Sequence, residues 1–244
     1  MFGDDNNYNA NGTYEASVTA LNEFMVKVFG WLFLGLIATA VTSFLFIGSL
    51  ANESSLAFRL FANPIFFFGI IIAELGIVVY LSRAINKISA GTAKMMYAVY
   101  AVLNGVTLSY IILAYAGADV TQAFIMAALF FGVMCMYGYF TKSDMTSLGR
   151  VLMVGLIVLI AAMVINMFIG SATMDFVVCV AGLMLFVGLT AYDVQKIKIQ
   201  DYTYVAGSGE EAAARTAIYG ALKLYLDFIN MFLFILRLLG IKSK

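Results

Sequence analysis

The sequence predicts an all-α integral membrane protein with seven helices, and three observations carry that prediction. Of its 244 residues, 63% are hydrophobic and 11% are charged, whereas soluble domains are about 45–50% apolar and about 25% charged. The mean hydropathy is +0.97. Long uncharged windows recur along the chain, each close to the ~20 residues that a membrane-spanning helix needs. Helices follow because hydrocarbon leaves every backbone polar group to be satisfied within the segment.

The elements follow in order from the amino terminus. Residues 1–22 are polar, lack the basic and then apolar pattern of a signal peptide, and predict a short N-terminal tail to a membrane domain over 23–244. Six apolar segments come next, and a seventh contains Lys223, Asp227 and Arg237. The expected spans are 28–52, 60–82 with Glu74 inside it, 95–118, 120–141, 151–174, 176–192 and 217–241.

Lysine and arginine favour one orientation. They gather in the loops after the second, fourth and sixth spans, and the loops near Gly117 and Ser171 have none. The positive-inside rule therefore places the N-terminus in the cytoplasm, and the absence of an organelle signal favours a bacterial inner membrane. The C-terminus is also basic, so the seventh helix is either re-entrant or an exception to the rule. The loop cations are Arg83, Lys87, Lys94, Lys142, Arg150, Lys196, Lys198 and Arg215.

Charge and composition exclude several function classes. Fourteen cationic and fourteen acidic side chains give a net charge of zero, which excludes a nucleic-acid binder that uses a broad basic face. The chain has no histidine, so a histidine triad, a histidine-ligated metal and a histidine pH switch are all excluded. Proton chemistry is left to carboxylates, lysines, tyrosines and cysteines, and no cofactor is implied.

Ionisable side chains within spans are the candidate functional residues, because each costs about 2.5–3.5 kcal/mol on insertion scales. Glu74 lies in the middle of a span, which favours pairing or a place in a pathway. Asp193 ends the sixth span, where an interfacial helix end is the alternative. Arg237 lies near a helix end, and we expect it to extend toward the lipid headgroups.

The seventh helix carries a polar stripe. Tyr219, Lys223, Asp227 and Asn230 are separated by four, four and three residues, so they share one helix face. Lipid would not compensate for burying these groups, which favours a face directed into the bundle or a wet cavity. Lys223 is one turn from Asp227 and is expected to neutralise it in part.

Two aspartate segments resemble the paired signatures of the Bax inhibitor-1 family in its bacterial form. They are residues 191–197, Ala-Tyr-Asp-Val-Gln-Lys-Ile, and 224–230, Leu-Tyr-Leu-Asp-Phe-Ile-Asn. Residues 104–109, Asn-Gly-Val-Thr-Leu-Ser, and 138–144, Gly-Tyr-Phe-Thr-Lys-Ser-Asp, support the likeness. The resemblance covers roughly residues 20–242, which is nearly the whole chain.

The resemblance implies a bundle whose last, charged helix is wrapped by the other six, and a pH-sensitive calcium leak. It implies that Asp193 and Asp227 share a proton and meet the transported calcium, with an arginine of the second helix bonded to the pair. Arg83 is the candidate for that arginine. Implied partners are membrane lipid, calcium ions and other membrane proteins.

The chemistry of two neighbouring carboxyl groups agrees with this role. Two carboxyls close together in a low-dielectric bundle do not readily both ionise, so they titrate as a pair. A shared proton would hold the sixth and seventh helices together. Losing it leaves two repelling charges, which favour separation or the capture of a hard cation such as calcium.

Two other function classes remain as alternatives. An intramembrane aspartyl protease also uses two aspartates, and Tyr192-Asp193 matches half of its pattern. Asp227 lacks the Gly-x-Gly-Asp context, and Pro64 is the only proline, so no Pro-Ala-Leu motif exists. The other alternative is a non-conducting regulator that binds other membrane proteins. We expect a leak channel and no enzyme activity.

Overall fold

The computed structural model describes residues 5–61, 63–115 and 117–242, and within them it confirms the predicted class. Seven helices of the described residues are long enough and apolar enough to cross a membrane. Shorter helical pieces connect some of them. The elements are α1 (Asp5–Leu50), α2 (Leu56–Phe61), α3 (Pro64–Ala84), α4 (Ala90–Ile112), α5 (Gly117–Phe140), α6 (Thr146–Ile169), α7 (Ala172–Lys196), the π-helical turn η1 (Ile197–Asp201), α8 (Tyr202–Val205) and α9 (Gly209–Lys242).

Each predicted span overlaps one long helix, but the ends differ. The spans 28–52, 95–118 and 120–141 run past the ends of α1, α4 and α5, the span 60–82 includes the end of α2, and the span 151–174 reaches into α7. The sixth candidate span runs over Ala172–Asp201, against an expected 176–192. The predicted span ended at the charged residues on either side of it, Asp175 and Asp193. The helix continues through both, because Asp175 pairs with Arg237 of α9 and the side chain of Asp193 is buried against other helices.

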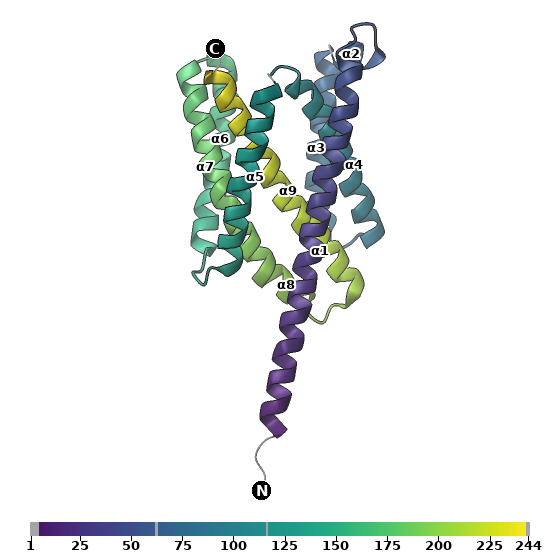
Figure 1. Ribbon diagram of the computed structural model, residues 1–244, viewed down its shortest axis with the longest axis vertical. Helices are drawn as coiled ribbons and strands as arrows, with labels where there is room; N and C mark the ends of the chain where they lie inside the picture. The colour runs from purple at the N-terminus through teal and green to yellow at the C-terminus, as the bar shows by residue number, and fades with distance from the viewer. Residues whose placement is uncertain (1–4, 62, 116, 243–244) are drawn as a thin grey trace.

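The N-terminal segment is helical as well. α1 begins at Asp5, so residues expected as a polar tail continue the first helix. In Figure 1 this part of α1 projects away from the other helices as a single rod.

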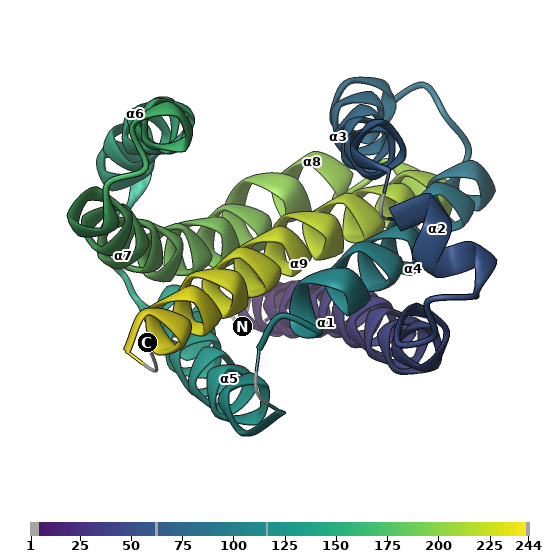
Figure 2. The same ribbon diagram turned by 90° about the horizontal axis from the view of Figure 1, so that it is seen from above.

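The helix α9 crosses the bundle between two groups of helices. It contacts α1, α3, α4, α5 and α7, whereas α6 packs mainly against α7. Figure 2 shows α9 running across the middle of the view, with α6 and α7 toward one of its ends and α3 and α4 toward the other. We call the end of the bundle where α9 finishes the C-terminal end, and the end from which α1 projects the N-terminal end (Figure 1).

The core is built largely on α9. Leu224, Tyr225 and Met231 have no exposed surface. The ring of Tyr225 meets those of Tyr97 and Tyr100 of α4 edge-on, with centroids 6.1 and 5.5 Å apart. These contacts position one face of α9 against α4, and the polar stripe predicted from the sequence lies on another face.

Two glycines allow helices to approach closely. Gly138 of α5 lies against the backbone of Ala191 in α7, where an added Cβ would overlap the Ala191 carbonyl oxygen. Gly105 of α4 lies against α1, where an added Cβ would stand 2.6 Å from the Thr39 carbonyl oxygen. In each case the neighbour is backbone, which cannot rotate away.

We therefore expect Gly138→Ala to destabilise the protein by about 1–3 kcal/mol, the usual cost of overpacking. Gly132→Ala is the matched control on the same helix, because no atom lies within 4 Å of its added Cβ. That control should be neutral or slightly stabilising, since alanine is the better helix former by about 1 kcal/mol. Thermal unfolding of both variants in detergent measures the difference, and equal melting temperatures would contradict the close α5–α7 approach.

Candidate functional site

Asp193 of α7 and Asp227 of α9 line one cavity of about 460 Å³ between α3, α4, α6, α7 and α9, and this cavity opens toward the exposed side chains of Leu75 and Ile160. Both side chains are buried, with 9% and 4% of their surface exposed. The cavity wall also takes in Glu74 of α3 and apolar side chains of α6. Two carboxyl groups that are 34 positions apart in the chain, on different helices, therefore line one hollow.

The two carboxyls interact electrostatically without a hydrogen bond between them. The charge of Asp193 acts on Asp227. Among the described residues, Asp227 Oδ2 is a buried oxygen with no hydrogen-bond partner. A buried oxygen of this kind is costly unless a proton, a cation or water satisfies it. Asp227 therefore presents an unsatisfied carboxyl oxygen close to Asp193.

Lys223 supplies the positive charge of this cavity. Its Nζ lies 3.0 Å from Oδ2 of Asp201, and the two side chains are only 15% and 17% exposed. The charge of Lys223 also acts on both Asp193 and Asp227. Asp201 ends the π-helical turn η1, and π turns inside longer helices often mark functional sites.

Glu74 lines the same cavity and is held by two donors from α4. Thr107 Oγ1 donates to Glu74 Oε1 at 2.6 Å, and Asn104 Nδ2 donates to Glu74 Oε2 at 3.3 Å. The side chain is 7% exposed. Both carboxyl oxygens of Glu74 are therefore engaged, in contrast to Oδ2 of Asp227.

The hydrogen-bonded network continues from Glu74 through α4 and α9 to α1. Tyr225 OH donates to Asn104 Oδ1 at 2.9 Å. The same hydroxyl is hydrogen-bonded to Oγ1 of Thr39 at 2.6 Å, and this Oγ1 also lies 2.9 Å from the Ala101 carbonyl oxygen. All of these side chains are buried. The network ties four helices together at the edge of the carboxylate cavity.

Asn230, the last member of the predicted stripe, also lines the cavity. Its Nδ2 donates to the Leu226 carbonyl oxygen of its own helix at 2.8 Å. The structure thus brings Asp193, Asp227, Glu74, Lys223 and Asn230 to one cavity.

Arg83 lies elsewhere. It is exposed in the last turn of α3 and does not line the carboxylate cavity. Arg237, expected to extend toward lipid headgroups, instead forms an ion pair with Asp175 of α7. The C-terminal part of α9 contacts α7, so the exposed guanidinium meets a carboxylate of the neighbouring helix at the bundle surface.

The segments that carried the resemblance contact one another. Gln195 of α7 donates through Nε2 to the Ser143 carbonyl oxygen at 2.7 Å and accepts from the Met145 N–H at 3.0 Å. It therefore holds the loop between α5 and α6 onto the helix that carries Asp193. In that loop, hydrogen bonds from Thr146 lower the pKa of the exposed Asp144 carboxyl.

Several residues of the site escaped sequence reasoning. Asn104 and Thr107 were noted only as part of a supporting motif, and Tyr225 only as a neighbour of Asp227. Asp175 and Asp201 fell outside the expected spans. The helical repeat offered a usable signal, because Asp227, Asn230, Phe234 and Arg237 follow one another at steps of three, four and three.

A buried carboxyl pair in a hollow between apolar spanning helices defines a multi-pass membrane protein with an intramembrane ionisable site. The chain belongs to the Bax inhibitor-1 family, because the family model described as "Inhibitor of apoptosis-promoting Bax1" matches residues 21–244.

Bacterial relatives are similar over most of their length. The inner membrane protein YbhL of Escherichia coli is 39% identical over 227 residues, which covers 90% of this chain and 92% of YbhL. An uncharacterized protein of Borreliella burgdorferi is 39% identical over 220 residues, which covers 90% of this chain and 92% of that protein. An uncharacterized membrane protein of Streptococcus pyogenes is 37% identical over 227 residues, which covers 93% of this chain and 96% of that protein.

Proposed function

We propose that this protein is a passive, pH-sensitive leak for calcium or a related cation, and that Asp193 and Asp227 form its gate. The observation that carries the proposal is the buried carboxyl pair facing a cavity of about 460 Å³, with Oδ2 of Asp227 unpartnered among the described residues. A gate of this kind needs no enzyme activity and no cofactor.

The gate would work through the shared proton. With one proton between them, the carboxyls attract each other and hold α7 against α9. Without it, two negative charges repel in a medium that screens them poorly, which favours separation of the helices or entry of a cation. The cation is stabilised by oxygen ligands, as calcium is in proteins.

The number of oxygens favours passage over storage. Calcium sites of high affinity use six to eight oxygen ligands. The pair supplies two carboxyl groups, and Glu74 is already engaged by Thr107 and Asn104. Within the described residues, no three His, Cys, Asp or Glu side chains are placed to hold a metal ion together. A cation that meets only the pair is held loosely and can leave again.

The family and the loop charges support a proposed localisation. The protein is a multi-pass membrane protein, and the relative YbhL is an inner membrane protein of Escherichia coli. We place this chain in a bacterial inner membrane with its N-terminus in the cytoplasm, because the cationic loops between α3 and α4 and between α5 and α6 share the N-terminal end of the bundle (Figure 1).

Calcium efflux from liposomes that contain the purified protein tests the proposal. We expect efflux above that of protein-free liposomes, and we expect the rate to change between about pH 6 and 8. Asp144→Asn is the control for a carboxyl outside the cavity and should leave the rate and its pH profile unchanged. Absence of protein-dependent efflux would overturn the leak and would favour a non-conducting regulator, which retrieval of a defined membrane partner would then identify.

A further inference from the structure

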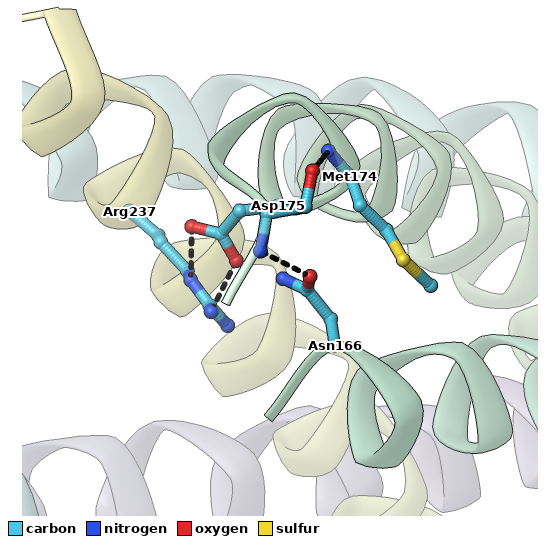
Figure 3. Close-up of polar contacts among 5 residues, drawn as sticks. Asn166, Met174, Asp175 and Arg237 are labelled. Atoms are coloured by element: carbon cyan, nitrogen blue, oxygen red, sulfur yellow. Dashed lines mark hydrogen bonds and ion pairs between the residues drawn. The ribbon is translucent and has the colours of Figure 1, made fainter. Parts of the chain in front are cut away.

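A second charged pair lies at the C-terminal end of the bundle. Asp175 belongs to the first turn of α7, and Arg237 belongs to the last part of α9. Arg237 Nε donates to Asp175 Oδ2 at 3.2 Å, and its Nη2 contacts Asp175 Oδ1, so the contact has two points (Figure 3). The side chains of Arg237 and Asp175 are 41% and 21% exposed, so the pair lies at the surface of the bundle near the ends of both helices.

Hydrogen bonds in the turn before α7 fix the position of Asp175. Asn166 of α6 accepts a hydrogen bond through Oδ1 from the Ser171 N–H at 3.1 Å, and Ser171 Oγ accepts from the Met174 N–H at 3.3 Å (Figure 3). Gly170 between them has a φ of 68°, a left-handed conformation that favours glycine. These contacts fix where α7 begins and therefore where its first carboxylate lies.

The pair lines a hollow that adjoins the carboxylate cavity. Asp175, Arg237 and Asn166 line a cavity of about 800 Å³. Ile71 of α3 and Met163 of α6 line both this cavity and the one that holds Asp193 and Asp227. Arg237 stands ten residues beyond Asp227 on α9, about 15 Å along the helix. The two hollows therefore succeed each other along one side of α9.

We infer that the Asp175–Arg237 ion pair controls the access of cations from the C-terminal end of the bundle, through the hollow of about 800 Å³, to Asp193 and Asp227. We call this entrance, at Asp175 and Arg237, the mouth. The inference rests on the proposed leak. While the pair is intact, its charges cancel and the two side chains bridge α7 and α9 across the mouth. Opening of the pair exposes a carboxylate that attracts cations and a guanidinium that repels them. The balance of these two charges decides which ions reach the inner cavity.

The charges make opposite predictions for the two partners. Arg237→Gln leaves Asp175 unpaired at the mouth, and we expect calcium efflux to rise by a few-fold to about tenfold, because charged clefts concentrate counter-ions on this scale. Asp175→Asn leaves the guanidinium unpaired and should lower efflux by a similar factor. Both effects should shrink in high salt, since the mouth is partly exposed and salt screens exposed charges.

The experiment measures efflux from liposomes for wild type, Arg237→Gln, Asp175→Asn and the double variant. If the ion pair only held α7 and α9 together, both single variants would change efflux in the same direction, and that result would overturn the inference. The double variant should return toward wild type because neither charge remains. Arg237→Lys, which keeps the charge and gives up the two-point contact, should stay near wild type and serves if Arg237→Gln does not fold.

The pH profile separates this inference from the proposed function. All variants at the mouth should keep the wild-type pH dependence, because Asp193 and Asp227 are intact in each. If wild-type protein does not conduct, that measurement contradicts both the proposed leak and the proposed role of the Asp175–Arg237 pair. If wild type conducts with its pH profile and the four proteins show equal efflux, the role of the mouth alone is wrong.

Discussion

Replacing Asp227 by asparagine is expected to abolish the pH dependence of calcium efflux. The wild-type rate should change by up to about tenfold per pH unit, the limit for one titrating proton. Asparagine keeps the size of the side chain and removes its ionisation, so the pair can no longer gain or lose a shared proton. The rate of Asp227→Asn should therefore vary less than about twofold between about pH 6 and 8.

Asp193→Asn should behave in the same way, since either partner suffices to break a shared titration. Asp144→Asn is the matched control, because it makes the same chemical change at an exposed loop carboxyl outside the cavity. A wild-type pH profile in both cavity variants would show that the proton is sensed elsewhere. An altered profile in only one of them would mean that the two aspartates do not titrate as a pair.

Phe234→Ala should raise calcium efflux severalfold while keeping its pH dependence. The ring of Phe234 lies against Gly182 of α7, with its centroid 5.9 Å from that of Phe186. Phe234 lines the carboxylate cavity, and Arg237, three residues further along α9, lines the neighbouring one. Removing the ring enlarges the carboxylate cavity toward the neighbouring hollow and leaves Asp193 and Asp227 in place.

Phe232→Ala is the matched control for this variant. Phe232 is buried on the same helix but lines a separate cavity with Thr39 and Phe124. Either truncation should cost about 3–5 kcal/mol of stability, the usual range for a buried phenylalanine. Only Phe234→Ala should raise efflux. Equal efflux from the two variants, measured in the same liposomes, would mean that general loosening of the bundle and not a local passage is responsible.

The hydrophobicity of the sequence predicted the centres of the helices far more reliably than their ends. Each apolar window marked one long helix, because backbone polar groups in hydrocarbon leave no other solution. The ends were misjudged wherever a charged residue continued the helix, as at Asp175 and Asp201. Their partners, Arg237 and Lys223, lie on a helix distant in sequence, and local composition does not show them.

The candidate site was predictable where it depended on helical periodicity. The spacing of Lys223, Asp227 and Asn230 placed them on one face, and the structure directs that face into a cavity with Asp193. The partners of Glu74 were not predictable, because Asn104 and Thr107 reach it only through the rotation of α4 against α3. Arg83 shows the same limit: its position near the end of α3 leaves it exposed and away from the pair.

Infrared difference spectroscopy on the purified protein in lipid tests most directly whether Asp193 and Asp227 share a proton. Between about pH 6 and 8, the protein should lose the absorption of one protonated carboxyl group. The midpoint should match that of calcium efflux, and either Asp193→Asn or Asp227→Asn should remove this transition. Two separate transitions, each removed by only one of the substitutions, would contradict a proton held in common by Asp193 and Asp227. A midpoint unrelated to that of efflux would contradict its role as the gate.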